Sequence, residues 1–271
     1  MGLKSQIAGT ASSGGEVLFV GAGPGDPELI TLKGLRALQQ ADLVVYAGSL
    51  VNPALLDECR PSCTIHDSAP LNLDQVLELL IAGAEAGQKV VRLHTGDPAL
   101  YGAIQEQMEA LDAAGICYRV IPGVTATFAA AASLKQELTL PGVSQTLVLT
   151  RLAGRTPVPD AEALRNIARI GGTICLYLSV GMMEKLVSEL LAGGLFTLET
   201  PVAVVYRASW PDEKIVEGTL ADIAAKVAEA DITRQALILV GEVLRARQQG
   251  VPEKSKLYDP GFAHGYRDNS V

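Results

Sequence analysis

No stretch of the 271-residue sequence stays apolar for the roughly 20 residues that a membrane-spanning helix needs. The beginning of the chain also lacks the basic and then apolar segments of a signal peptide. It starts Met1-Gly2, as myristoylated proteins do, but it has Gln6 where that motif needs serine or threonine. We therefore expect a cytoplasmic protein with no membrane partner.

Cysteine is scarce, and no two cysteines form a C-x-x-C pair: they are Cys59, Cys63, Cys117 and Cys175. This spacing does not suit a metal site, so we expect no bound metal and free thiols in a reducing compartment. The net charge of −8 argues against nucleic acid as a partner. The G-x-S-x-G and Cys–His patterns of nucleophilic catalysis are missing as well.

The composition is 48% apolar, and the length suits one or two domains with a sizeable core. In the first half, short apolar runs alternate with helical patterns, which predicts a parallel sheet in an α/β domain. The predicted strands are residues 17–20, 43–46, 64–66, 89–93 and 117–121. The predicted helices run from the first turn to residue 40, over 73–86 and from 98 to 114.

The second half begins with residues 124–133, a helix of very small side chains that allow close approach of a neighbouring helix or of a ligand; packing is the interpretation we favour. The strands predicted after it are residues 146–150, 173–178, 202–206, 214–217 and 236–240, with helices at 161–168, 183–191 and 220–230. No helix separates residues 202–206 from 214–217, so we expect an antiparallel pair and a mixed sheet. We divide the chain into a disordered segment (1–15), two α/β domains (16–122 and 123–246) and a polar tail (247–271), which is a flexible end or an arm on a neighbour.

The same Gly-Asp-Pro turn follows two predicted strands, at Gly25 and at Gly96. In each turn the aspartate, Asp26 or Asp97, suits a helix N-cap, and the proline suits the first helical position. Ligands of parallel α/β sheets bind outside the carboxyl ends of the strands, where such turns lie. We predict that the two turns are neighbours at one sheet edge and line a binding site; two capped helix starts are the alternative.

The first turn is similar to the dinucleotide fingerprint G-x-G-x-x-G, but Asp26 replaces its third glycine. Pro24 offers no N–H to a phosphate, and Asp26 is negative where a pyrophosphate would bind. Asp42 precedes the second strand, whereas the acid that binds a ribose should follow it. An NAD-type oxidoreductase therefore remains a weak alternative, together with a non-catalytic ligand-binding module.

Three segments resemble the tetrapyrrole methylases, which use S-adenosylmethionine in cobalamin and sirohaem synthesis: VGAGPGDPELITLKG from Val20, HTGDPALYG from His94 and IPGVTA from Ile121. The resemblance covers about residues 17–244. Four more stretches resemble the precorrin-4 methylases of that family: YAGSLVN from Tyr46, TRLAGRTP from Thr150, YRASWPDEKI from Tyr206 and SKLYDPGF from Ser255.

This resemblance implies two α/β domains with the active-site cleft between them, a homodimer, and methylation of precorrin-4 or cobalt-precorrin-4 at ring carbon 11. It leaves open another precorrin carbon, uroporphyrinogen III or a modified translation factor as the methyl acceptor. By their positions in the motifs, the residues implied at the cofactor are Pro24, Thr95, Gly96, Asp97, Leu100, Thr125, Ala126, Leu178 and Ala208. Thr95 stands where the family often has glycine, and Leu178 where methionine is frequent.

Three arginines follow predicted strand ends, where they can bind precorrin carboxylates through two hydrogen bonds each: Arg151, Arg155 and Arg207. The alternatives for these three arginines are a solvated side chain or an internal ion pair with Asp212 or Glu213. Methyl transfer from a sulfonium requires alignment more than a strong protein nucleophile, so no catalytic residue is assigned. The candidates are His94, Asp97 and Arg207, although His94 fits a structural role and Asp97 an N-cap first.

Overall fold

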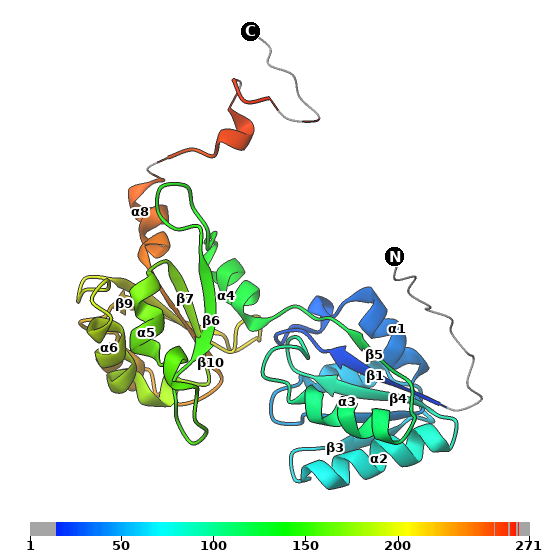
Figure 1. The fold of residues 1–271 in the computed structure, drawn as a ribbon. Coiled ribbons are helices and arrows are strands. Elements are labelled where there is room, and N and C mark those ends of the chain that lie inside the picture. Colours follow the sequence, from blue (N-terminus) through cyan, green and yellow to red (C-terminus); the bar gives the residue numbers. More distant parts are fainter. Residues whose placement is uncertain (1–14, 252, 260, 264, 266–271) are drawn as a thin grey trace, which may run out of the picture. The chain divides into compact units, whose positions relative to one another are not determined.

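A computed structural model of the protein describes residues 15–251, 253–259, 261–263 and 265 (Figure 1). The chain divides into two compact units, unit 1 with residues 1–125 and unit 2 with residues 126–271. The segment expected to be disordered lies outside the described residues, apart from Gly15. In the described part of the tail, the structure has a short helix, α8 (Ala246–Gln249), and a 3-10 helix (Lys256–Tyr258).

Unit 1 contains a five-stranded sheet in the order β3-β2-β4-β1-β5, and all its pairings are parallel. Its strands are β1 (Glu16–Gly21), β2 (Leu43–Tyr46), β3 (Thr64–Asp67), β4 (Lys89–His94) and β5 (Tyr118–Ile121). Most residues of the three central strands are buried, and most of these are apolar, as expected for a parallel sheet with helices on both faces; Arg92 and His94 are buried polar exceptions in β4. The parallel sheet predicted for the first half is confirmed.

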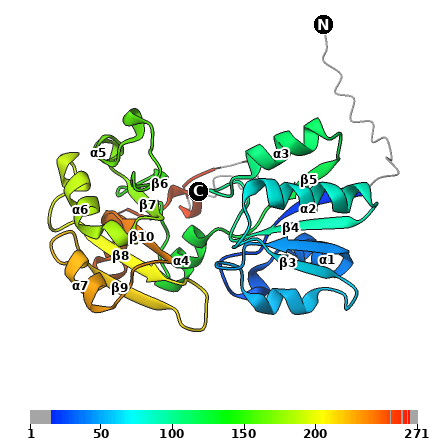
Figure 2. The same ribbon diagram turned by 90° about the horizontal axis from the view of Figure 1, so that it is seen from below.

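Helices cover both faces of this sheet, and two apolar clusters fill the space between the layers. Helix α1 (Leu32–Gln40) and a 3-10 helix (Pro53–Glu58) pack on one face. Helices α2 (Leu73–Glu85) and α3 (Ile104–Ala113) pack on the other, as Figure 2 shows. The chain therefore leaves β1 toward one face and β4 toward the other, although these strands are neighbours.

The helices predicted directly after the two Gly-Asp-Pro turns begin later than expected. The first turn continues into a 3-10 helix (Pro27–Leu29), and α1 starts only after Thr31, whose hydroxyl accepts the N–H of Gly34 at 3.1 Å. After the second turn, α3 begins at Ile104 rather than at position 98. Tyr101 and Ala103 have φ values of 57° and 49°, which a right-handed helix does not allow.

Unit 2 contains a mixed sheet in the order β6-β7-β10-β8-β9. Its strands are β6 (Leu147–Arg151), β7 (Thr173–Tyr177), β8 (Pro201–Tyr206), β9 (Lys214–Thr219) and β10 (Ala236–Val240). Strands β6 and β7 are parallel, β10 is antiparallel to both of its neighbours, and β8 and β9 form a hairpin. The mixed sheet and the antiparallel pair around Trp210 are both confirmed.

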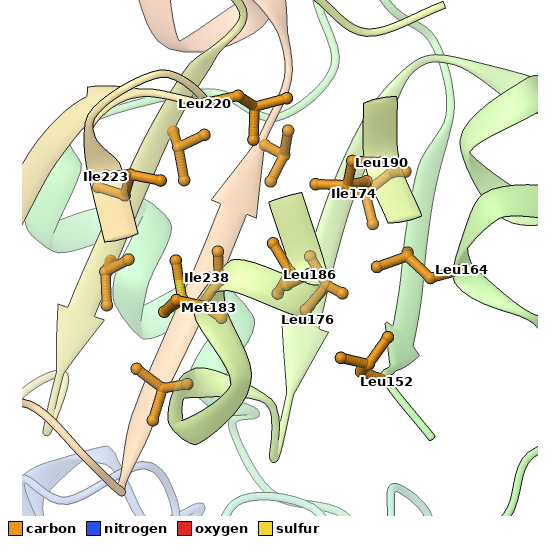
Figure 3. Close-up of a cluster of buried hydrophobic side chains, with 14 of the residues drawn as sticks. Leu152, Leu164, Ile174, Leu176, Met183, Leu186, Leu190, Leu220, Ile223 and Ile238 are labelled. Carbon is orange, nitrogen blue, oxygen red and sulfur yellow. The ribbon is translucent and has the colours of Figure 1, made fainter. Parts of the chain in front are cut away.

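The main core of unit 2 lies between the sheet and helices α5 (Leu164–Ile167), α6 (Met183–Ala192) and α7 (Ile223–Glu229). Figure 3 shows Leu186 and Leu190 of α6 beside Ile174 and Ile238 of the sheet. The helix expected over residues 161–168 is shorter, because Ala163 has an extended conformation that separates α5 from the preceding 3-10 helix.

Helix α4 (Ala126–Leu134) covers the opposite face of this sheet. Ala129 and Ala130 of this helix pack with Cys175 and Ala203 in a cluster of mostly alanines and leucines. The helix therefore packs closely on a neighbour, as favoured from the sequence, but this neighbour is the sheet and not another helix. Among the described residues, the structure has no helix that is both long and apolar enough to cross a membrane.

Candidate active site

In unit 1, the turns that follow β1 and β4 are joined by backbone hydrogen bonds at the carboxyl edge of the sheet. The N–H of Gly96 donates to the carbonyl of Gly23 at 2.8 Å, and the N–H of Gly23 donates back to Gly96 at 3.3 Å. The prediction that the two Gly-Asp-Pro turns are neighbours is confirmed. The chain leaves β1 and β4 toward opposite faces of the sheet. The edge at the carboxyl ends of these two strands is therefore the topological switch point, where ligands of open α/β sheets bind.

Asp97 connects this pair of turns to the one that follows β5. One oxygen of its carboxylate accepts the N–H of Ala99 at 2.8 Å, and the other accepts the N–H of Gly123 at 2.9 Å. The contact leaves no room for side chains, since a Cβ on Gly123 would lie 2.1 Å from the carbonyl oxygen of Gly96. The prediction that Asp97 is the N-cap of a helix beginning at position 98 is wrong, because α3 begins at Ile104; the carboxylate instead accepts the N–H of Ala99 within the turn. Its carboxylate is already used by two backbone N–H groups.

The cofactor residues predicted in unit 1 all belong to these three turns. Pro24 and Gly96 are buried, whereas Thr95, Leu100 and Thr125 are half-buried. The turn after β4 is also strained at Tyr101 and Ala103. Strained backbone of this kind concentrates at functional sites, where the surrounding structure maintains it.

In unit 2, backbone strain gathers at one edge of the sheet. Leu178 follows β7 with φ 54°, Arg207 and Ser209 follow β8 with φ 47° and 69°, and Gln235 precedes β10 with φ 53°. Because β10 is antiparallel to β7 and β8, all four residues lie at the same edge. Among the described residues, eight non-glycine residues have positive φ, and six of them lie in these two strained edges.

The cofactor residues predicted in unit 2 lie at or near this edge. Leu178 is 69% exposed although it is apolar, while Ala208 is buried between Arg207 and Ser209. Ala126 is the first residue of α4, whose start is attached to β7: the Tyr177 hydroxyl accepts the N–H of Thr127 at 3.1 Å. The exposed Leu178 leaves apolar surface at this edge.

The side chain of Arg207 is engaged within its own turn. Nη1 lies 2.5 Å from Oδ2 of Asp212, and the guanidinium lies 4.0 Å from the centre of the Trp210 ring. Its Nε is buried and has no hydrogen-bond partner among the described residues. The ion pair considered as the alternative for Arg207 therefore exists, with Asp212. Glu213 instead accepts hydrogen bonds from Ser133 and from the N–H of Ser209, both at 2.7 Å.

Of the other two predicted arginines, Arg151 is the last residue of β6 and Arg155 follows it; the carboxyl end of β6 lies at the same edge as that of β7. Arg151 donates to the carbonyls of Thr156 and Pro157, at 3.1 and 2.6 Å, so it stabilises its own loop. Arg155 is exposed.

Comparison with known proteins identifies the family. The sequence pattern of the Tetrapyrrole (Corrin/Porphyrin) Methylases matches residues 16–224. The chain belongs to this family. The family resemblance seen in the sequence and the expected two-domain α/β architecture are thereby confirmed.

Two relatives of this methylase are named for methylation of precorrin-4 or cobalt-precorrin-4. A cobalt-precorrin-4 C(11)-methyltransferase of Methanocaldococcus jannaschii is 54% identical over 93% of this chain and 96% of its own. A precorrin-4 C(11)-methyltransferase of Pseudomonas aeruginosa is 51% identical over 93% and 98%.

Two solved structures are also similar to this methylase. A cobalt precorrin-4 methyltransferase, described as a cobalamin biosynthetic enzyme, superposes with a TM-score of 0.82 and 46% identity, covering 84% of this chain and 95% of its own. A uroporphyrin-III C-methyltransferase of Thermus thermophilus, complexed with S-adenosylhomocysteine, has a TM-score of 0.72 and 32% identity, with 85% and 94% covered.

His94 is the last residue of β4 in this methylase and is only 5% exposed. Its Nε2 is buried without a hydrogen-bond partner among the described residues, and its ring lies 6.0 Å from that of Phe19. Burial, and then the nearby charge of Arg92, lowers the pKa of His94 to about 3. An imidazole with this pKa is neutral at pH 7 and a poor proton acceptor, which favours the structural role for His94.

Sequence reasoning missed three side chains that hold the two edges in place, Arg92, Gln107 and Tyr177, and it considered Glu213 only as an ion-pair partner of an arginine. The sequence around Gln107, Tyr177 and Glu213 is typical of an ordinary protein surface, so it did not indicate these contacts. Arg92 could have been noticed, because it is a charged residue within the apolar run of a strand. The alternation of strands and helices predicts that this strand is buried in a parallel sheet.

We expect His94 to make the stability of this methylase depend on pH. The unfolded imidazole binds a proton below about pH 6.5, while the native one stays neutral down to about pH 3. The stability due to neutral His94 is therefore present above pH 6.5 and is lost as the pH falls toward 3. Thermal unfolding should show a smaller decrease between pH 7.5 and 5 for His94→Gln than for the wild type.

The matched control is His66→Gln, which removes a half-buried imidazole from the edge strand β3 and leaves His94 in place. It should retain the pH dependence of the wild type. Equal pH dependence in the wild type and in His94→Gln would contradict the buried neutral state of His94.

Proposed function

We propose that this methylase transfers a methyl group from S-adenosylmethionine to carbon 11 of precorrin-4 or cobalt-precorrin-4 in cobalamin biosynthesis. The observation that carries the proposal is the pairing of the Gly23 and Gly96 turns at the switch point of unit 1, within the motifs of the family. The choice among tetrapyrroles rests on the two relatives with 54% and 51% identity.

The residues proposed at the cofactor suit a nucleoside joined to an amino acid. Leu178, Ala126 and Ala208 provide an apolar side chain and small neighbours, which suit an adenine ring. Thr95 and Thr125 provide hydroxyls, while the Asp97 carboxylate holds the turns together by accepting two backbone N–H groups. In support, a related structure with 32% identity contains S-adenosylhomocysteine.

The proposed catalytic contribution of the protein is orientation. When bound, the cofactor supplies a methyl group on a sulfonium, which already has a good leaving group. The protein then has to align the acceptor carbon with the methyl and sulfur atoms, an effect worth up to about 7–11 kcal/mol in well-oriented reactions. Rigid turns meet this need, and neutral, buried His94 supplies no positive charge near the sulfonium.

The proposed acceptor carries many carboxylates, whereas the protein has a net charge of −8. Long-range attraction is therefore unfavourable, and binding depends on local arginines at the strained edge of unit 2. Arg207 is the first of these, because Asp212 and Trp210 hold its guanidinium in one orientation. Arg155 and Arg151 complete the proposed set.

A methyl-transfer assay tests the proposed function. The protein is incubated with S-adenosylmethionine and, in parallel, with precorrin-4, cobalt-precorrin-4 and uroporphyrinogen III. Mass spectrometry counts the added methyl groups, and NMR locates them. We expect a single methyl group at carbon 11 of one precorrin-4 form. Methylation of uroporphyrinogen III instead, or of another precorrin carbon, would replace the proposed substrate with one of its alternatives.

We expect Arg207→Ala to raise the KM for the tetrapyrrole roughly 10-fold or more, since hydrogen bonds to charged groups contribute about 1.5–3 kcal/mol. The KM for S-adenosylmethionine should stay close to that of the wild type. Arg207→Lys should recover only part of the loss, because lysine lacks the planar guanidinium. Steady-state kinetics with each substrate varied in turn measures both constants.

Arg165→Ala is a suitable control, because Arg165 lies on α5 and its ion pair with Glu189 involves α6 rather than the strained edge. An Arg207→Ala enzyme with the wild-type KM for the tetrapyrrole would show that Arg207 only stabilises its own turn.

We also propose a homodimer, as the family resemblance implies, in the cytoplasm, which suits cysteines expected to be free thiols. Light scattering at micromolar concentration should then give twice the chain mass of 28.4 kDa. A mass of 28.4 kDa under these conditions would contradict the dimer.

A further inference from the structure

Arg92 is a buried cation in the central strand β4 of unit 1, with 7% of its surface exposed. Nη1 donates to the carbonyl of Val45 at 3.1 Å, and Nε donates to Oε1 of Gln107 at 3.3 Å. Within the described part of the chain, no carboxylate forms an ion pair with it. Burial lowers its pKa to about 10, so it stays charged at pH 7. A buried charge without a counter-ion is costly, and its retention calls for a reason.

The contact of Arg92 determines which way the Gln107 amide points. A guanidinium only donates hydrogen bonds, so it requires the oxygen of the amide to face it. The nitrogen of the amide is then directed away, and it donates to the carbonyl of Ala103 at 2.9 Å. Gln107 is 4% exposed, so water does not compete for these contacts.

Ala103 is the point where the turn after β4 joins α3. It is the N-cap residue of α3, with φ 49° and no side-chain cap. Two residues earlier, Tyr101 has φ 57°, and a Cβ on Gly102 would lie 2.2 Å from the carbonyl oxygen of Pro98. This segment is strained and tightly packed, and the Gln107 amide is a side chain that holds its carbonyl.

We propose that Arg92 and Gln107 are positioning residues for the cofactor turn at Thr95–Leu100. The guanidinium orients the amide, the amide holds Ala103 in its left-handed conformation, and Ala103 fixes the end of the turn that begins at Thr95. This proposal rests on the proposed function, because it takes that turn to bind the cofactor. Neither residue touches the reacting atoms.

Two substitutions at position 107 separate positioning from stability. Gln107→Glu retains an oxygen for Arg92 and supplies its counter-ion, but an ionised carboxylate cannot donate to the Ala103 carbonyl. Gln107→Met removes both contacts. The unfolding temperature should therefore be lower for Gln107→Met than for Gln107→Glu. Positioning predicts that both variants bind S-adenosylhomocysteine roughly 10-fold more weakly than the wild type, despite their different stabilities.

Gln105→Glu is the matched control. It makes the same change of charge two residues earlier on α3, at an exposed side chain whose amide donates to Glu109. It should keep the wild-type affinity. Isothermal titration calorimetry with S-adenosylhomocysteine measures the affinities, at a temperature where every variant is folded.

Hydrogen exchange of a peptide covering residues 97–104 gives a readout that needs no ligand. Exchange there should accelerate in Gln107→Glu and in Gln107→Met, but not in Gln105→Glu. Wild-type affinity and wild-type exchange in Gln107→Glu would overturn the positioning role. The role would also be overturned if Gln107→Met bound the ligand more weakly than Gln107→Glu in proportion to its lower unfolding temperature. A wild-type protein that does not bind S-adenosylhomocysteine would overturn the proposed function. The exchange rates would still show whether Arg92 and Gln107 hold the turn.

Discussion

The two hydrogen bonds between Gly23 and Gly96 are the contact on which the candidate site of unit 1 depends. They join the turns of neighbouring strands whose chains leave toward opposite faces of the sheet, and this divergence opens the edge to a ligand. The third turn can approach only because Gly123 has no side chain, and the Asp97 carboxylate then fastens it through a backbone N–H. The site is built largely from backbone groups that are ordered before any ligand arrives, which reduces the entropy lost on binding.

The two units use strain in the same way, at different kinds of sheet. In unit 1 the strained residues follow a parallel strand, and in unit 2 they border the exits of β7 and β8 and the entry of β10. Left-handed conformations of non-glycine residues cost about 1–3 kcal/mol each, so they persist only where other contacts enforce them. Gln107 does this for Ala103, and Glu213 does it for Ser209 by accepting its N–H. Gln107 is buried and lies outside the family motifs, whereas Glu213 is half-buried and belongs to the YRASWPDEKI stretch.

Much of the fold could be predicted from the sequence because it depends on local patterns. Alternating strands and helices indicated the parallel sheet, and the missing helix before residues 214–217 indicated the antiparallel pair. The prediction failed where the conformation of a few residues matters, as at Tyr101 and Ala103, which delay α3 until Ile104. Neither residue type favours positive φ, so no local pattern announces this break.

The sequence by itself determined the family, the two sheets and the position of the Gly-Asp-Pro turns, because these depend on hydrophobic periodicity, capping residues and motifs that lie within short segments. Only the tertiary structure decided that Arg207 pairs with Asp212 rather than Glu213, and that a buried Arg92 faces an amide instead of a carboxylate. Such choices depend on distances between segments that are far apart along the chain, or on the exact path of a strained turn. Burial then shifts the pKa of the groups involved, as it does for His94.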